Sequence, residues 1–209
     1  MTVPSGIVTC LPAADIDDLV GVVEVLVQEQ LPVFAAPVDS LRELGQVFGP
    51  RAVFGAWQVA DREGLEAAHG AGAEFVLADV VDRELAWYAD SEGLTVFGSA
   101  TTHLEVRAVL ELGLTGALLW PADIVGHVMA GHLARVGLAE RVIPMGGVGA
   151  FAAGEWMKHG SPAACVDATL LGDAVDGGDL GQLRDRCASF RKAAQRAVEH
   201  RGSVAAASS

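Results

Sequence analysis

Two titratable side chains of this chain stand where they could move a proton during catalysis. Asp167 falls inside the apolar run 164–171, and a carboxylate in such a run is costly to bury unless it is paired or does chemical work. His103 follows another apolar run, and an imidazole can act as acid or base near neutral pH. The plainer interpretations are a hydrogen-bonded structural aspartate and a solvated histidine in the first turn of a helix. We predict Asp167 and His103 as the catalytic residues.

Two tryptophans near the ends of apolar runs could shape a pocket for a small molecule. Small-molecule sites are usually apolar and carry a few polar groups, and Trp57 and Trp120 have polar neighbours in the sequence. The indoles fit equally well as filling of the protein interior, so both interpretations stay open. The predicted substrate-binding residues are Trp57, Gln58, Asp79, Thr101, Thr102, Trp120, Met145 and Thr169.

The sequence also contains oxygen ligands from which a divalent metal site could be assembled. A weak candidate for a Mg²⁺ or Mn²⁺ site consists of Asp79, His103, Asp123 and Asp167. No ligand spacing supports it, and helix capping is the simpler interpretation of Asp79 and Asp123. His127 and His132 are five residues apart on an expected helix, which places them on different faces. We predict neither a metal nor a cofactor.

The elements that must position these residues follow a regular alternation. Short apolar runs alternate with longer segments rich in Ala, Leu and Glu, which is typical of a parallel sheet covered by helices on its outer face. The runs span residues 6–12, 32–38, 52–59, 75–80, 94–101, 116–121, 141–147 and 164–171. Eight strand–helix units predict a (β/α)8 TIM barrel as a single domain over residues 1–200. We expect a disordered C-terminal tail over residues 201–209.

The expected helix starts agree with this alternation. Asp61 precedes one helical segment as an N-cap residue would. Thr101 or Thr102 precedes another, and Glu105 stands where a capping box requires a carboxylate. The last helix is expected over residues 179–200.

Composition and charge exclude several classes of partner. The chain has 209 residues, a formal net charge of −13 and 51% hydrophobic residues. Nucleic acids and anionic membranes need clustered Lys and Arg, so we expect neither as a partner. No apolar run approaches the length of a membrane span, and the N-terminus lacks the pattern of a signal peptide, so we expect a cytoplasmic protein. The three cysteines have no ligand-like spacing and indicate reduced thiols.

Four fragments of the chain have the order and composition of segments found in one enzyme family. Gly55-Ala56 is similar to Gly-Ala-Gly-Thr, and Gly70-Ala-Gly-Ala-Glu-Phe75 to Ala-Gly-Ala-Gln-Phe. Trp120-Pro-Ala122 is similar to Phe-Pro-Ala, and Pro144-Met-Gly-Gly-Val148 to Pro-Thr-Gly-Gly-Ile. On these fragments the chain resembles the KDPG/KHG aldolases, class I pyruvate aldolases, over roughly residues 6–180. The resemblance implies a TIM barrel and a homotrimer.

The residues that the resemblance would make catalytic are different in this chain. The lysine that forms the Schiff base corresponds to Leu118, and the glutamate that serves as general acid and base beside it corresponds to Ala35. The two lysines of the chain are Lys158 and Lys192, and both lie in expected helices. Because barrel chemistry occurs at the C-terminal ends of strands, neither is expected to replace the missing nucleophile.

The positions that the resemblance assigns to anion binding have changed as well. An arginine and a threonine of the family correspond to Asp39 and Gln58. The Gly-Gly-Ser phosphate cradle corresponds to Asp167-Ala168-Thr169, where a carboxylate would repel a phosphate dianion. Arg51 and Arg141 precede their strands and are expected on the opposite face of the barrel.

These replacements predict that both imine chemistry and phosphate binding have been lost. We expect cofactor-free acid/base chemistry of the C–C lyase, dehydratase or cyclase type on a neutral or hydrophobic small molecule, in specialised metabolism. The alternative is a catalytically inactive pseudo-aldolase that binds a ligand or a partner. An intact pocket favours the enzyme, whereas strand ends plugged by Trp57 and Trp120 favour the alternative.

Overall fold

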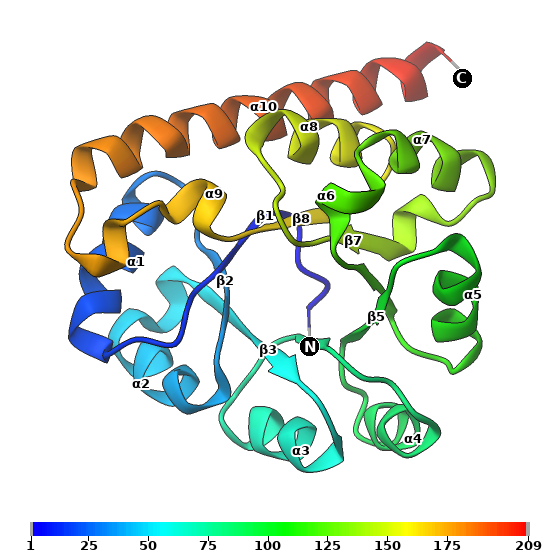
Figure 1. Cartoon of the computed structure of the whole chain (residues 1–209), viewed down its shortest axis with the longest axis horizontal. Helices are drawn as coiled ribbons and strands as arrows, with labels where there is room; N and C mark the ends of the chain where they lie inside the picture. The colour runs from blue at the N-terminus through cyan, green and yellow to red at the C-terminus, as the bar shows by residue number, and fades with distance from the viewer. Residues whose placement is uncertain (1, 208–209) are drawn as a thin grey trace.

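The computed structural model describes residues 2–207 as a barrel of parallel strands surrounded by helices (Figure 1). The strands are β1 Gly6–Cys10, β2 Val33–Ala36, β3 Val53–Val59, β4 Val76–Ala78, β5 Val96–Ala100, β6 Gly116–Leu119, β7 Val142–Pro144 and β8 Ala163–Val166. The α-helices are α1 Ile16–Gln28, α2 Val38–Phe48, α3 Arg62–Gly70, α4 Arg83–Ser91, α5 His103–Glu111, α6 Ala122–Val125, α7 Val128–Arg135, α8 Ala150–Lys158, α9 Ala168–Leu171 and α10 Leu180–Ala207. The 3-10 turns are η1 Gly49–Arg51, η2 Ala139–Arg141 and η3 Ala174–Asp176.

The sheet confirms the predicted TIM barrel. The strands pair in parallel in the order β7-β6-β5-β4-β3-β2-β1-β8. The first and last strands pair directly, with Val8 opposite Cys165, so the sheet wraps around on itself. Strands β7 and β8 lie beside each other, but no ladder joins them within residues 2–207, and the barrel is therefore nearly closed. The C-terminal strand ends all meet at one mouth, where barrel enzymes hold their active sites.

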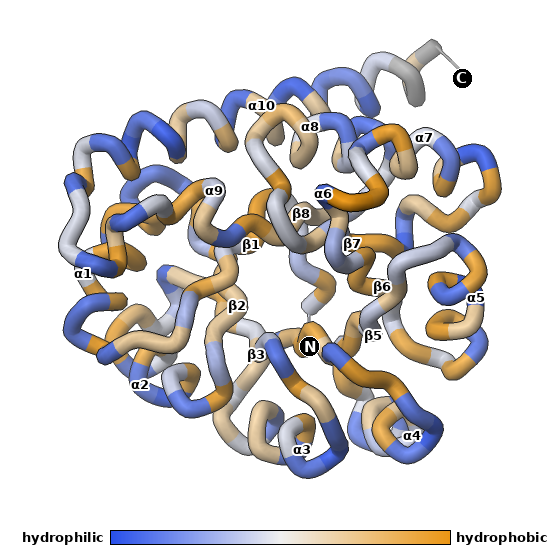
Figure 2. Tube along the Cα trace, viewed as in Figure 1, coloured by the Kyte–Doolittle hydropathy of each residue, from blue (hydrophilic) through white to orange (hydrophobic). Residues whose placement is uncertain are grey.

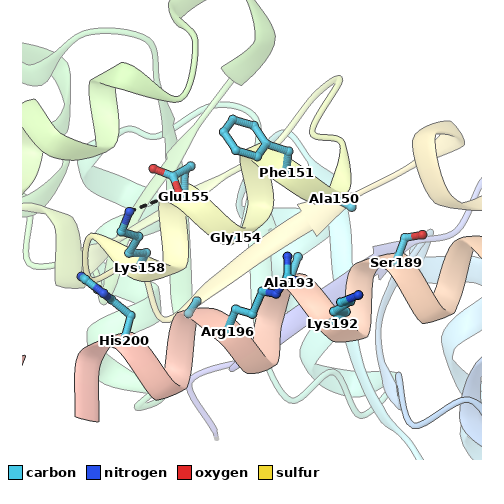
Figure 3. A pocket seen from close by; sticks show the side chains of 11 residues that line it. Ala150, Phe151, Gly154, Glu155, Lys158, Ser189, Lys192, Ala193, Arg196 and His200 are labelled. Atoms are coloured by element: carbon cyan, nitrogen blue, oxygen red, sulfur yellow. Dashed lines mark hydrogen bonds and ion pairs between the residues drawn. The ribbon is translucent and has the colours of Figure 1, made fainter. Parts of the chain in front are cut away.

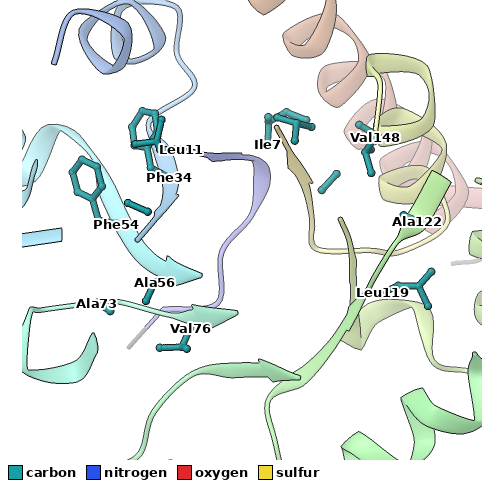
Figure 4. Close-up of a cluster of buried hydrophobic side chains, with 14 of the residues drawn as sticks. Ile7, Leu11, Phe34, Phe54, Ala56, Ala73, Val76, Leu119, Ala122 and Val148 are labelled. Carbon is teal, nitrogen blue, oxygen red and sulfur yellow. The ribbon is translucent and has the colours of Figure 1, made fainter. Parts of the chain in front are cut away.

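Buried apolar side chains form two layers, one between the strands and the helices and one inside the barrel. The outer layer lies between the strands and the helices and includes Phe34 and Phe54, whose rings stack with centroids 5.3 Å apart (Figure 4). The chain is hydrophobic along β1 and hydrophilic over much of α10 (Figure 2). Strand β1 is apolar because both of its faces are buried, whereas α10 exposes one face to solvent.

Two predicted helix starts are confirmed by their hydrogen bonds. At the start of α3, Asp61 Oδ1 accepts from the backbone N–H of Gly64 at 2.8 Å. At the start of α5, Thr102 Oγ1 accepts from the N–H of Glu105 at 3.3 Å, and Glu105 Oε2 accepts from the N–H of Thr102 at 2.8 Å. This is the capping box expected from the sequence.

The chain departs from the sequence-based prediction at several element boundaries. Strand β8 ends at Val166, and the apolar residues 168–171 form helix α9 in place of the end of a strand. Helix α10 continues to Ala207, so residues 201–207 are helical where a disordered tail was expected; residues 208 and 209 lie outside the described part. The expected caps Asp79 and Asp123 are wrong, because Asp82 caps α4 and Pro121 precedes α6.

The structure also bears on the cysteines and on the length of the helices. Cys10, Cys165 and Cys187 are all buried free thiols, as expected from their spacing. Among residues 2–207, none of the helices combines the length and the apolar character needed to cross a bilayer.

Candidate active site at the barrel mouth

The interior of the barrel is filled by an apolar cluster drawn from the strands and the residues beside them. Every second residue of a barrel strand points inward, and no residue of a helix belongs to the cluster. Ala35 and Leu118 both lie in it, with exposed fractions of 0% and 1%. The buried members are Val8, Cys10, Ala35, Phe75, Leu77, Phe97, Leu118, Ile143, Met145, Ala163 and Cys165, and Val33, Val53 and Trp57 pack against them.

The ionisable groups of this interior cluster are two thiols. A hydrogen bond with Cys165, together with burial, raises the pKa of the Cys10 thiol well above its ordinary value. Cys10 therefore stays a neutral thiol at physiological pH. Because the thiolate is the nucleophilic form, the geometry argues against a cysteine nucleophile at this place.

Above the cluster, the C-terminal strand ends form a hollow that we call the mouth cavity, with a volume of about 380 Å³. It brings together the last residue of β1, the loop that follows it, the end of β3 and the β8–α9 turn. Its lining residues are Cys10, Pro12, Ala13, Ala14, Trp57, Asp167, Ala168, Leu171, Gly172, Val175 and Asp176. The lining contains two carboxylates and no lysine, arginine or histidine.

Asp167 lies at the edge of the mouth cavity in a defined structural position. It is the N-cap residue of α9, and its Oδ1 accepts from the backbone N–H of Thr169 at 3.3 Å. The side chain is half-buried, and the residue lies beyond β8. The prediction that Asp167 stands inside an apolar strand is therefore wrong, because the run 164–171 changes from strand to helix at this residue. Asp167 therefore both caps α9 and lines the mouth cavity.

Trp57 forms a fixed wall of the same cavity. Its indole Nε1 donates to the carbonyl of Leu11 at 3.0 Å, and the ring packs against the interior cluster. Ala56 of β3 pairs with Val76 of β4, and Val59 pairs with Ala78. Between these two pairs β3 has one residue more than β4, which is a β-bulge. Such bulges are enriched next to active sites, where they redirect a side chain.

Gln58 sits in this bulge with an unusual backbone conformation. Its φ is +60°, a left-handed value that is uncommon for a residue with a Cβ, and its side chain is exposed. Strained residues of this kind cluster at ligand sites, although the sequence alone gave no sign of the strain.

The second predicted indole lies elsewhere. Trp120 is 51% exposed and lines a separate cavity of about 300 Å³ together with Thr101. The hydroxyl of Thr101 donates to the carbonyl of Trp120 at 2.9 Å. The two indoles line different cavities, so the predicted single pocket walled by both is not formed. Thr102 is engaged in the cap of α5.

The remaining predicted residues are dispersed. His103 begins α5, and its ring packs edge-on against His132 with centroids 5.3 Å apart, while His127 packs against Phe151. His103 is not among the residues that line the mouth cavity, so the structure does not bring it to Asp167 there. Met145 is buried in the interior cluster.

Two other predicted positions bear on charge and packing at the mouth. Asp79 lies at the surface after β4, where desolvation raises the pKa of its carboxyl. The hydroxyl of Thr169 donates to the carbonyl of Val148 at 2.8 Å, which ties α9 to the segment before α8. Within residues 2–207, no group of three or more His, Cys, Asp or Glu side chains is arranged to hold a metal ion.

The contribution of β1 and of the turn after α9 to the mouth cavity was not predicted from the sequence. Pro12, Ala13 and Ala14 line the mouth cavity from the loop after β1, and Asp176 lines it from η3. The loop carries no chemically distinctive side chain, and Asp176 is one of many surface carboxylates in an acidic chain. The position of residues 11–14 directly after a strand was the available signal.

Comparison with known proteins assigns the family. Residues 5–185 match the family described as KDPG and KHG aldolase. The chain belongs to the KDPG and KHG aldolase family. A curated relative, the 2-dehydro-3-deoxy-phosphogluconate aldolase of Treponema pallidum (strain Nichols), is 26% identical over 133 residues, which are 63% of this chain and 63% of the relative. The chain thus matches less than two thirds of that relative's length.

Solved structures agree with the barrel architecture. A structure described as native KDPGal is 21% identical, with a TM-score of 0.81, and the match covers 95% of this chain and 98% of that one. The KDPG aldolase of Legionella pneumophila, solved with pyruvate captured as a covalent carbinolamine, is 17% identical with a TM-score of 0.72, covering 88% and 92%. At these identities the likeness shows the fold alone.

Proposed function

We propose that this member of the KDPG/KHG aldolase family does not form a lysine imine with its substrate. The observation that carries the proposal is the apolar interior at Ala35 and Leu118, the positions where the resemblance places the glutamate and the lysine. Lys158 ends α8 and Lys192 lies within α10, so both amines stand on outer helices. An imine mechanism needs an amine at the strand ends, and these helices do not supply one.

The mouth cavity suits a neutral or hydrophobic small molecule. Its walls are mostly apolar, and its charged groups, Asp167 and Asp176, would repel a phosphate or a carboxylate. We therefore propose that phosphorylated sugars are not the natural substrates. The reaction class that fits is cofactor-free proton transfer of the C–C lyase, dehydratase or cyclase type.

Asp167 is the residue we propose as the acid/base. Its Oδ1 is held by the N–H of Thr169, which fixes the carboxylate at the cavity wall. The indole N–H of Trp57 is already donated to Leu11, so Trp57 would contribute its apolar ring and not a hydrogen bond. The hydroxyl of Thr169 is likewise committed to Val148, which leaves the carboxyls of Asp167 and Asp176 as the groups able to exchange a proton with a bound molecule, and of these Asp167 is the one held by a backbone N–H.

The test compares two aspartates that hold the same kind of structural position. Asp167→Asn retains the shape and the capping oxygen but removes the titrating proton. Asp61→Asn makes the same change at the N-cap of α3, away from the cavity. Each protein is incubated with a pool of neutral hydroxy-ketones and hydroxy-aldehydes, and consumption is followed by mass spectrometry.

The proposed role requires a rate about 10²–10⁴ lower in Asp167→Asn and an unchanged rate in Asp61→Asn. An active Asp167→Asn protein would remove Asp167 from the mechanism. No consumption of any compound by the natural protein would count against the enzyme proposal.

A catalytically inactive pseudo-aldolase is the second candidate function. The observation in its favour is that the hydrogen-bond donors of Trp57, Thr101 and Thr169 are all used inside the protein. Binding of a compound from the pool without its conversion, detected by calorimetry, would support this candidate over the enzyme.

The resemblance to the family also supports a homotrimer, which we propose as the assembly in solution. Ile124 and Val128, at the mouth side of the barrel, are 77% and 76% exposed, and such apolar side chains are often buried between subunits. Light scattering that reports a monomer would contradict this assembly.

A further inference from the structure

A second large cavity lies on the outside of the barrel, between helices α8 and α10 (Figure 3). We call it the helix cavity; its volume is about 510 Å³. It shares no lining residue with the mouth cavity, so it is a separate site. Its lining residues are Ala150, Phe151, Gly154, Glu155, Lys158, Ser189, Lys192, Ala193, Arg196, Ala197 and His200.

The lining follows one face of each helix. On α10 the residues recur at intervals of three or four, from Ser189 through Lys192 and Arg196 to His200. On α8 they run from Ala150 through Gly154 to Lys158. Two regular helices therefore present their facing sides to the cavity, and its shape does not depend on a loop.

The floor of the helix cavity is apolar. A Cβ placed on Gly154 would lie 3.3 Å from the Cβ of Ala193, so the two helices approach closely at this point. Ala193 and Ala197 leave room above this approach because their side chains are short. The ring of Phe151 stands at one end and is 70% exposed. An apolar group could pack against Phe151 and the two alanines with a gain in buried surface.

The rim of the cavity is cationic in a protein with a net charge of −13. Both lysines of the chain line it, and along α10 Arg196 lies between Lys192 and His200 (Figure 3). Lys158 pairs with Glu155 at 3.4 Å. Within the described residues, the side chains of Lys192, Arg196 and His200 form neither an ion pair nor a hydrogen bond.

Other cations of the chain have carboxylate partners. Arg51 pairs with Glu24 at 2.9 Å, and Arg191 pairs with Glu29 at 2.6 Å. Lys192 and Arg196, by contrast, face a cavity with one carboxylate, that of Glu155, which Lys158 already neutralises. The two unpaired cations are available for an anion supplied from outside.

We propose that the helix cavity binds a small organic anion with an apolar body, its carboxylate or phosphate held by Arg196 and Lys192. The planar guanidinium of Arg196 can donate two parallel hydrogen bonds to either group, and Lys192 adds a point charge one turn away. The apolar body would lie on Ala193, Ala197 and Phe151. The acidic mouth cavity would repel the same molecule, so the two sites select ligands of opposite character.

The test uses four probes that separate charge from apolar contact: octyl phosphate, octanoate, octanol and inorganic phosphate. Each is titrated into the full-length protein by calorimetry, and backbone amide shifts of Gly154, Ala193 and Ala197 report the place of binding. The charge variant is Lys192→Glu with Arg196→Glu. The matched control is Arg83→Glu with Arg107→Glu, which makes the same change in charge at two exposed arginines of α4 and α5.

We expect octyl phosphate, octanoate or both to bind one molecule per chain and to shift the three amides. The better of the two tells which anionic group the site prefers. Affinity should fall by about tenfold or more in the charge variant and stay the same in the control, because hydrogen bonds to charged groups are lost. Octanol lacks the anionic group and inorganic phosphate lacks the apolar chain, so each should bind more weakly.

Three results would overturn the proposal. One is the absence of binding by both amphipathic anions. Another is an equal loss of affinity in the charge variant and in the control, which would mean attraction by overall charge. The third is octanol binding as tightly as octyl phosphate, which would mean a purely apolar cavity. Phe151→Ala, which changes an exposed ring, gives a further check: it should weaken octyl phosphate more than inorganic phosphate.

Discussion

Asp167 combines a structural role, as the cap of α9, with a place in the wall of the mouth cavity. Its choice as a site residue rested on a carboxylate inside an apolar strand, yet the strand ends at Val166 and Asp167 caps a four-residue helix. The residue still reaches the mouth cavity, because the turn from β8 to α9 lies at the strand ends. The order of the elements predicted the place of Asp167 correctly. Its burial was not predicted correctly, since an apolar helix turn and an apolar strand end look alike over four residues.

The same carboxylate leads to a prediction about phosphate. The natural protein should bind KDPG weakly or not at all, because Asp167 and Asp176 line the mouth cavity and no cation of the lining offsets them. Asp167→Gly removes one repulsive charge and should, if anything, improve binding by about 1 kcal/mol, about fivefold. Calorimetric titration measures both proteins, with Asp61→Gly as the control at the N-cap of α3. Tight binding of KDPG by the natural protein would refute this view of the cavity.

The secondary-structure elements were predicted better than their ends. The alternation of apolar runs and helical segments predicted all eight strands, and the capping box at Thr102 predicted the start of α5. The bulge of β3 and the left-handed Gln58 were not predicted, because both arise from pairing with β4 and not from local sequence. The continuation of α10 to Ala207 was missed because Gly202 and the alanines after it resemble a polar tail.

Gly116 is sensitive to substitution because the backbone of η2 and the ring of Phe97 lie close to it. A Cβ at Gly116, the first residue of β6, would lie 2.5 Å from the carbonyl oxygen of Arg141 and 2.6 Å from the ring of Phe97. Because one of these neighbours is backbone, Gly116→Ala should destabilise the fold by about 1–3 kcal/mol. Gly45→Ala is the control: nothing lies within 4 Å of its added Cβ in α2, and it should stabilise by roughly 0.5–1 kcal/mol. Urea unfolding measures both, and equal effects would contradict the packing.

The capping box predicts a dependence of stability on pH. Hydrogen bonds from the N–H groups of Thr101 and Thr102 lower the pKa of Glu105 below its ordinary value of 4.5. A carboxyl with a lowered pKa in the folded state contributes stability above its unfolded pKa and loses it as the pH falls through the folded pKa. On acidification the natural protein should therefore lose more stability than Glu105→Gln. Unfolding midpoints over a pH series test this, with Glu111→Gln on the same helix as control; parallel curves would contradict it.

At the scale of the whole molecule, the chain has the barrel of its family around an apolar interior. The strand order and the apolar shell agree with those expected of a TIM barrel, while the interior cluster contains Ala35 and Leu118. Lys158 and Lys192 lie on outer helices and line the helix cavity, which shares no lining residue with the mouth cavity. The family assignment was predictable from short fragments, and the helix cavity was not, because it depends on two helices meeting face to face.

The central claim, that no lysine imine forms, can be tested with one measurement. The natural protein is incubated with pyruvate and borohydride, which would trap an imine as a stable secondary amine, and its intact mass is then measured. The interior at Leu118 and the outer positions of Lys158 and Lys192 predict an unchanged mass. A mass increase that corresponds to one reduced pyruvate, located on Lys158 or Lys192, would contradict the account.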